Sequence, residues 1–289
     1  MPNNWKFYLI LILVFANFSV FGVILRGLAV EEPSVYFLPV GQGDAALLTI
    51  QKNNILIDAG PSSKIVNQLD GIIPLYNRKI DLLFISHPNI DHFGGVFELA
   101  KRYKIRAVFL NGVRTEQGSY KNLINLIKEQ QIPIIYARRG QEISFLTGQE
   151  KEAKFVILWP GLELKSGALI KDKQLNDTSI VGLFSYQGLQ GLFTGDISTK
   201  AEKALLASLP DVDFLKVPHH GSKYSSSEVF LEKIRPEIAA IGVGKNSYGH
   251  PTPEALSRLK AIGAEVFRTD VDGLVRIFWQ NNQINLTTD

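Results

Sequence analysis

Cysteine is absent from the chain. Without thiols the protein can form neither a disulfide framework nor a metal site with thiolate ligands, and the redox compartment stays open. Any metal site must therefore be built from oxygen and nitrogen ligands. Only five histidines are available to supply imidazole nitrogens.

A strong excess of charge of one sign is also absent. The 31 basic and 28 acidic residues leave a net charge of +3. That balance excludes a dedicated nucleic-acid coat and a polybasic membrane surface. No low-complexity linker and no repeat of about 20 to 50 residues occurs. With 289 residues and 45% hydrophobic content, the chain is long enough to bury a core as one large domain or two small ones.

Long apolar runs are absent except at the N-terminus. From Phe7 to Leu25, flanked by Lys6 and Arg26, roughly 19 residues carry no charge, which is about the length that crosses a bilayer core. The run predicts a single-pass membrane anchor. A cleaved signal peptide with secretion is the second interpretation, and a buried core helix is the third.

The charges around this run favour an N-terminus on the inside and the rest of the chain outside the membrane. We therefore expect two parts. Residues 1–30 form the anchor or signal segment, and residues 31–289 form an extracytoplasmic domain.

After residue 32, short apolar strands alternate with amphipathic helices, a pattern typical of an α/β domain. Strands are expected near 34–40, 45–50, 54–60 and 81–86, and again near 179–186, 191–195, 213–217 and 237–243. Helices are expected over 96–103 and 120–130. Further helices should open at Thr199, at Ser225 with Glu228 in a capping box, and at Thr252 before Pro253. Two sheets flanked by helices are implied.

One short segment, "HPNIDH", concentrates metal-competent side chains. His87, Asn89, Asp91 and His92 follow a predicted strand and precede a helix, so a loop there can aim all four inward. Imidazole and carboxylate suit zinc, manganese or iron, and a strand end gives such a site rigid support. The alternative is a polar loop in which a histidine caps the next helix and Asp91 binds loop amides.

The other metal-competent residues also lie at the ends of predicted elements. Asp196 closes one strand, His219 and His220 follow another, and His250 precedes Pro251. Surface histidines would instead scatter over helices and hairpins. Each residue taken alone has a structural alternative: a helix cap for Asp196, a core histidine for His219 and turn chemistry for His250.

Several motifs in order resemble the metallo-β-lactamase fold hydrolases, and in particular the extracytoplasmic metallo-β-lactamase-like domain of ComEC competence proteins. The resemblance covers about residues 34–279 and rests on "FLPVGQGDA", "LIDAG", "SHPNIDHFGG", "TGDIS", "LKVPHHGSKYSSS", "GKNSYGHP" and "FRTDVDGLVRI". It implies a four-layer αββα sandwich. Two departures stand out: the second position of the H-x-H-x-D-H pattern is Asn89, and no histidine lies between His92 and His219.

The resemblance also implies a divalent metal, zinc or manganese, bound as one or two ions. The residues it assigns to the metal are His87, Asn89, Asp91, His92, Asp196, His219 and His250. In this assignment Asp91, His92 and Asp196 hold one ion, completed by His250 or His219, while His87 and Asp196 reach toward another. Asp58, at a strand end behind them, would orient a ligating imidazole.

The expected chemistry is hydrolysis by a metal-activated water at phosphorus or a carbonyl carbon. Asp91 or Asp196 would take or steer the proton, and His220 with Lys223 would stabilise the developing oxyanion. "HHGSKYSSS" combines Lys223 with hydroxyls and a predicted helix N-terminus, an arrangement suited to phosphate oxygens. Its serines can equally be explained by helix capping alone.

Three functions follow. The first is an anchored phosphodiesterase or nuclease acting on DNA, working beside a separate DNA-uptake channel, because one anchor cannot form a pore. The second is a catalytically weakened binding module of the same fold, favoured by Asn89 and the missing histidine. The third is a hydrolase of lactones, lactams or thioesters, which rests on fold analogy alone.

Overall fold

The computed structural model describes residues 7–15, 17, 33–147, 151–161, 164, 166–280 and 283–289. The chain divides into two units, Met1–Glu31 and Glu32–Asp289. Of the predicted membrane segment 7–25, residues 7–15 and 17 are described and are helical, and the rest lies outside the described residues. Among the residues that are described, no helix is both long and apolar enough to cross a membrane.

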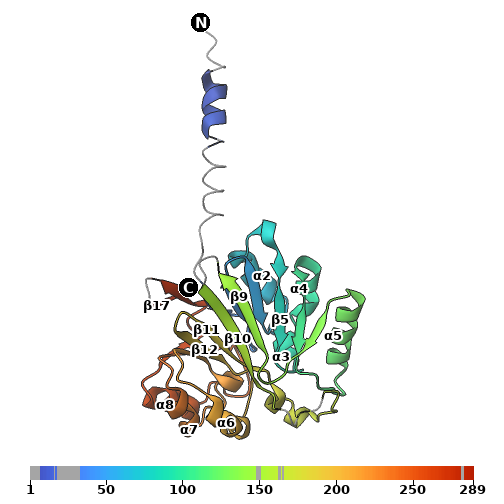
Figure 1. The fold of residues 1–289 in the computed structure, drawn as a ribbon, viewed down its shortest axis with the longest axis vertical. Coiled ribbons are helices and arrows are strands. Elements are labelled where there is room, and N and C mark those ends of the chain that lie inside the picture. The colour runs from blue at the N-terminus through green and yellow to red at the C-terminus, as the bar shows by residue number, and fades with distance from the viewer. Residues whose placement is uncertain are drawn as a thin grey trace. The chain divides into compact units, whose positions relative to one another are not determined.

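The second unit contains two large β-sheets (Figure 1). The first sheet has the order β17-β16-β1-β2-β3-β5-β7-β8 and the second the order β15-β14-β13-β12-β11-β10-β9, while β4 and β6 pair separately. The strands are β1 Ser34–Phe37, β2 Ala46–Ile50, β3 Asn53–Ile57, β4 Lys79–Ile80, β5 Leu82–Ile85, β6 Lys104–Ile105, β7 Val108–Leu110, β8 Ile134–Tyr136, β9 Glu142–Thr147, β10 Lys151–Trp159, β11 Val181–Tyr186, β12 Leu189–Phe193, β13 Phe214–Lys216, β14 Ile238–Ile241, β15 Glu265–Arg268, β16 Val275–Gln280 and β17 Gln283–Thr288.

Helices cover the outer face of each sheet. Figure 1 shows α2, α4 and α5 on one side of the strands and α6, α7 and α8 on the other. The α-helices are α2 Lys64–Ile72, α3 Ile90–Phe93, α4 Val96–Arg102, α5 Gly118–Glu129, α6 Thr199–Leu205, α7 Glu228–Ile234 and α8 Pro253–Ala261. The 3-10 turns are η1 Leu75–Asn77, η2 Asp172–Gln174, η3 Asn176–Thr178, η4 Leu206–Ser208 and η5 Pro218–Gly221.

Alternation along the strands divides the core into three layers. In β3, Ile55 and Ile57 face the layer between the sheets, while Leu56 faces the layer under α2, α4 and α5. A third apolar layer lies between the second sheet and α6, α7 and α8. Since side chains of a strand point alternately to its two faces, each sheet buries both faces. The predicted αββα sandwich is confirmed.

Phenylalanine fills the layer between the sheets. Phe84 stacks on Phe109 of its own sheet at 4.4 Å and meets Phe155 of the other sheet at 4.9 Å. Aromatic pairs of this kind contribute about 0.5–1.5 kcal/mol each beyond burial of their area. Gly182 makes room for Phe155, because a Cβ there would lie 2.0 Å from the ring.

Candidate metal centre

Five polar segments meet where strands of both sheets end. Asp58 follows β3 and Ser86 follows β5 in the first sheet, whereas Asp196 follows β12, His220 follows β13 and Gly242 follows β14 in the second sheet. These neighbours are parallel pairs, β3 with β5 and β12 with β13 and β14. Because the carboxyl ends of parallel strands share one edge, residues distant in sequence converge there.

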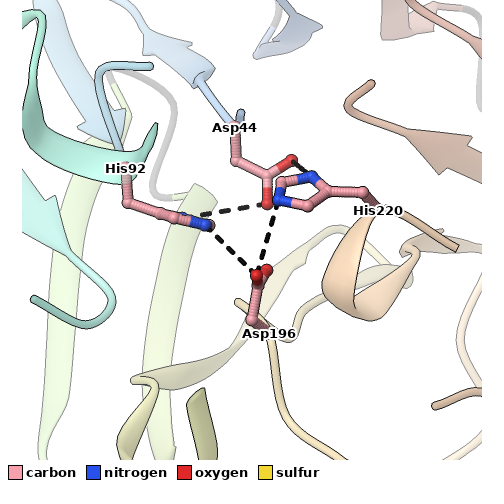
Figure 2. Close-up of side chains that lie close together, drawn as sticks. All are labelled: Asp44, His92, Asp196 and His220. Atoms are coloured by element: carbon pink, nitrogen blue, oxygen red, sulfur yellow. Dashed lines mark ion pairs between the residues drawn. The ribbon is translucent and has the colours of Figure 1, made fainter. Parts of the chain in front are cut away.

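Four buried side chains at this edge could hold a metal ion. Asp44, His92, Asp196 and His220 each offer one ligand atom, and these atoms all lie within 4.8 Å of one another. Figure 2 shows the four side chains converging, with ion pairs between them. Asp44 and His92 come from the half of the domain built on the first sheet, and Asp196 and His220 from the second.

The imidazole Nε2 atoms define the centre more closely. His92 Nε2 lies 3.3 Å and His220 Nε2 lies 3.4 Å from Asp196 Oδ2. Asp91 Oδ2 lies 3.3 Å from His220 Nε2 and 3.8 Å from His92 Nε2. Ligands about 2.0–2.2 Å from a tetrahedral zinc ion lie roughly 3.3–3.6 Å apart. Three of these four spacings fall in that range and the fourth, Asp91 Oδ2 to His92 Nε2, is longer, so Asp91, His92, Asp196 and His220 are candidates to share one ion.

The opposite nitrogen of each imidazole is already bound. His92 Nδ1 lies 2.8 Å from Asp58 Oδ2, and His220 Nδ1 donates to the Gly242 carbonyl oxygen at 2.7 Å. Neither Nε2 atom has a hydrogen-bond partner, although both are buried. A partner at Nδ1 sets the tautomer that leaves Nε2 free as a metal ligand. The site is therefore built to present two Nε2 atoms inward.

Asp58 is itself fixed by the residue before the histidine-rich segment. The Ser86 amide donates to Asp58 Oδ1 and the Ser86 hydroxyl to Asp58 Oδ2, both at 2.7 Å. Burial raises the pKa of Asp58 and outweighs the opposing effect of His92. The structure thus places Asp58 against the His92 imidazole, and its role in orienting a metal ligand stays a prediction.

A buried lysine lies beside the cluster. Lys216, the last residue of β13, forms an ion pair with Asp44, donates to the Gly195 carbonyl oxygen at 3.0 Å and lies 3.6 Å from Asp196 Oδ1. Burial lowers the pKa of Lys216, but Asp44 and Asp196 outweigh burial and the net pKa is raised. The ammonium is therefore charged at neutral pH.

The carboxylates strongly favour positive charge at the two inner histidines. Burial lowers the pKa of His220, but Asp196 and Asp44 raise it to about 10. Burial likewise lowers the pKa of His92, but Asp196 and Asp58 raise it well above its usual range. Protons bound to Nε2 compete with a metal, so metal affinity at this site falls as pH falls.

The comparisons with known proteins agree with this arrangement. Residues 38–109 match the model of the metallo-beta-lactamase superfamily. The chain is 27% identical over 272 residues to ComE operon protein 3 of Bacillus subtilis. The aligned region covers 87% of this chain and 34% of that protein. It is 28% identical over 254 residues to competence protein ComA of Neisseria gonorrhoeae, covering 85% of this chain and 32% of that protein.

The chain thus resembles the metallo-β-lactamase superfamily over residues 38–109. Its curated relatives are competence proteins of the ComEC type, and the chain spans about a third of their length. Igni18, a metallo hydrolase of Ignicoccus hospitalis, shares the fold with a TM-score of 0.54 at 16% identity. That match covers 86% of this chain and all of Igni18.

Three of the residues predicted to bind metal, Asn89, His219 and His250, are not among the four converging side chains. Asn89 Nδ2 donates to Asn176 Oδ1 at 2.9 Å, and Asn176 Nδ2 lies 3.1 Å from His219 Nε2. The Asn89 amide and the His219 ring are thus bound to each other through Asn176. The His250 ring stacks on Tyr248, and its centroid lies 5.5 Å from that of the His219 ring.

His87 is buried next to the cluster, and its ring centroid lies 4.2 Å from that of His92. Its Nδ1 contacts the Ser86 hydroxyl at 3.0 Å, while its Nε2 has no hydrogen-bond partner. Burial lowers its pKa to about 3, so the ring is neutral and its Nε2 can bind a metal.

His220, not His219 or His250, takes the place beside Asp196. The backbone has positive φ at three consecutive residues: 52° at His219, 53° at His220 and 79° at Gly221. Left-handed backbone at non-glycine residues costs about 1–3 kcal/mol each and is found where a site requires it. The turn sends the rings of two adjacent residues to different partners, His219 to Asn176 and His220 to the inner cluster.

Asp44, Lys216 and Asn176 were not predicted from the sequence as site residues. Asp44 stood in the quoted motif "FLPVGQGDA", and Lys216 interrupts the apolar strand "DFLKV". A lysine in a strand that is otherwise buried needs an anionic partner. This rule could have predicted that Lys216 pairs with a buried carboxylate such as Asp44. Asn176 is recognisable only from the fold.

The capping box predicted at Ser225 is wrong. Helix α7 begins at Glu228 after Ser227, and the Ser225 hydroxyl instead donates to the Ile197 carbonyl oxygen at 2.8 Å. The buried carboxylate of Glu202 in α6 accepts from the amides of Ser226 and Ser227 and from the Ser227 hydroxyl. Thr252 does cap α8, as predicted, by accepting from the Ala255 amide.

Glu202 therefore occupies the amides that a phosphate would use at the start of α7. Lys223 in the same loop is exposed, and its ammonium lies 5.3 Å from the centroid of the Tyr224 ring. Of the phosphate-binding features expected in "HHGSKYSSS", only the lysine remains exposed, because Ser222, Ser225 and Ser226 are buried and the Ser227 hydroxyl donates to Glu202.

We predict that Asp58→Asn weakens zinc binding about 10–100-fold, because an amide orients the His92 ring less well than a carboxylate does. Titration calorimetry at neutral pH measures the change. Asp81→Asn is the control, since Asp81 is also a buried carboxylate bound to a backbone amide but lies outside the cluster. Equal affinity of Asp58→Asn and the parent would show that His92 is positioned without Asp58.

Proposed function

We propose that this protein is a metal-dependent phosphodiesterase or nuclease that acts on DNA. The convergence of the His92 and His220 Nε2 atoms with oxygens of Asp91 and Asp196, at spacings of 3.3–3.8 Å, carries the proposal. These four residues would hold zinc or manganese. A divalent ion there supplies Lewis acidity and a water of lowered pKa.

The protein's own groups divide the remaining work. Asp58 and the Gly242 carbonyl hold the two imidazoles in the tautomer that a metal needs. Asp91 has 30% of its side chain exposed, whereas Asp196 has only 3%. Asp91 is thus the carboxylate that can pass a proton between the centre and solvent, and Asp196 is the buried structural ligand.

The pKa of Asp91 favours steering a water over holding its proton. Burial raises the pKa, but His92 and His220 lower it below its usual range, so the carboxylate is ionised at neutral pH. An ionised, partly exposed oxygen next to the reacting centre can accept a hydrogen bond from an attacking water and steer it.

DNA as the substrate rests on two supports. The relatives named above are competence proteins, which links them to DNA uptake. In this chain the loop that carries His220 also carries the exposed Lys223 and Tyr224, the latter 66% exposed. A cation and an aromatic ring at the surface suit a phosphate and a base of a single strand.

We predict that Lys223→Ala lowers the rate of DNA hydrolysis about tenfold or more, as expected for loss of one charge-assisted hydrogen bond of roughly 1.5–3 kcal/mol. The slope of log affinity against log salt should flatten by about 0.7–0.9. DNA affinity is measured at several salt concentrations. Lys128→Ala, which removes an exposed lysine at the end of α5, is the control. An unchanged slope in Lys223→Ala would mean that Lys223 does not contact phosphate.

We further propose that the run from Phe7 to Leu25 anchors the protein, with residues 31–289 outside the membrane beside a separate DNA-uptake channel. The uncharged length of the run supports this placement. Membrane fractionation of the full chain tests it. Recovery in the soluble fraction without detergent would contradict the anchor.

The function is tested by metal analysis of the purified chain, followed by hydrolysis of linear DNA and bis-p-nitrophenyl phosphate with zinc or manganese. Activity that disappears with chelator and returns with metal is expected. A catalytically weakened binding module is the second candidate, because Asn89 and His219 are engaged with Asn176. DNA binding without hydrolysis under either ion would favour that candidate.

A further inference from the structure

A second positive charge is already built into the centre. The Lys216 side chain is 6% exposed, and its Nζ meets three oxygens: Asp44 Oδ2 as an ion pair, the Gly195 carbonyl at 3.0 Å and Asp196 Oδ1 at 3.6 Å. Two carboxylates and a carbonyl are the ligands that a hard divalent cation prefers. The Lys216 ammonium therefore occupies the position in which a divalent cation would bind these three oxygens.

Asp196 divides its two oxygens between different cationic partners. Its Oδ2 faces the Nε2 atoms of His92 and His220, while its Oδ1 faces Lys216. In two-metal sites the ions lie about 3.5–4 Å apart and clamp the reacting group between them. Here Asp196 Oδ2 lies near the two imidazole Nε2 atoms, and Asp196 Oδ1 lies near the ammonium of Lys216.

The residues on the other side of the centre do not provide a full second ligand set. His219 Nε2 lies 3.1 Å from the Asn176 amide nitrogen, and the Asn89 amide nitrogen donates to Asn176. His87 Nε2 and His250 Nδ1, the latter on a ring 5.5 Å from that of His219, are the two buried ring nitrogens here without a hydrogen-bond partner. These described residues are histidines and amides with no carboxylate among them, and neutral ligands alone make a poor site for a doubly charged ion.

We infer that Lys216 is a permanent substitute for a second cation and limits the centre to one divalent ion per chain. It neutralises Asp44 and one oxygen of Asp196, and it is a positioning residue for the ligand set. This inference rests on the metal-binding part of the proposed function and not on its chemistry or substrate.

The test counts ions in the purified full chain, without substrate, by native mass spectrometry and by calorimetric titration with Mn²⁺. The parent should bind one ion. Lys216→Ala removes the ammonium and leaves space among three oxygens, so it should bind two. Lys216→Met removes the charge but fills the space, and as the matched control it should bind one.

Two ions of similar affinity in the parent would overturn the inference, as would one ion in a folded Lys216→Ala. If Lys216→Ala fails to fold, electron paramagnetic resonance of the Mn²⁺-loaded parent decides. The signal of an isolated ion supports the inference, and that of an exchange-coupled pair overturns it. One bound ion without hydrolysis would reject the proposed function and leave this inference standing.

Discussion

Asp196→Ala is expected to lower metal-dependent hydrolysis of bis-p-nitrophenyl phosphate by roughly 10³-fold or more at every substrate concentration. Asp196 Oδ2 is the one oxygen within 3.4 Å of both inner Nε2 atoms, so its loss removes the ligand shared by the two imidazoles. Metal content should fall with the rate. DNA binding, measured at low salt, should persist because the exposed lysines remain.

Asp211→Ala is the matched control for this prediction. Asp211 is 60% exposed and pairs only with Arg235 on the surface, an interaction of little energetic weight. Rate and metal content should equal those of the parent. An Asp196→Ala protein that is folded and hydrolyses the substrate at a normal rate would show that the reaction occurs elsewhere.

Glu202→Ala is expected to lower the free energy of unfolding by about 3 kcal/mol, because three donors lose a buried acceptor. These donors are the amides of Ser226 and Ser227 and the Ser227 hydroxyl. The loop they belong to also carries His220, so metal affinity should fall as well. Urea denaturation measures the first effect and calorimetry the second.

Glu228→Ala is the informative comparison. A capping box with Ser225 would make Glu228 the important carboxylate, whereas Glu228 is exposed and Glu202 holds the loop. Glu228→Ala should therefore cost only a few tenths of a kcal/mol. A larger loss for Glu228→Ala than for Glu202→Ala would restore the capping interpretation.

Periodicity in the sequence was enough to predict the layers of the fold. Short apolar runs identified strands such as β1 and β3, and the helix predicted over 120–130 overlaps α5, whose buried residues are Tyr120, Leu123 and Ile127. Local spacing also placed the N-cap of α8 at Thr252. These features depend on neighbours a few positions apart, and such contacts are encoded locally.

The composition of the centre was harder to predict, because its contacts join distant segments. Asn89 and Asn176 are 87 positions apart, and Glu202 lies 25 positions before the serine that it binds. No spacing rule reaches that far. The choice between His219 and His220 depended on a turn with left-handed backbone at both residues, which residue types alone do not reveal.

The inner ligands come from opposite halves of the sandwich, Asp91 and His92 from the first sheet's side and Asp196 and His220 from the second. A bound ion would therefore act as a removable cross-link between two layers, added to the buried ion pair of Lys216 with Asp44. Ligand at a hundredfold excess over its dissociation constant stabilises the folded state by about 2.7 kcal/mol. The melting temperature would then serve as a direct gauge of occupancy, readable before any substrate has been identified.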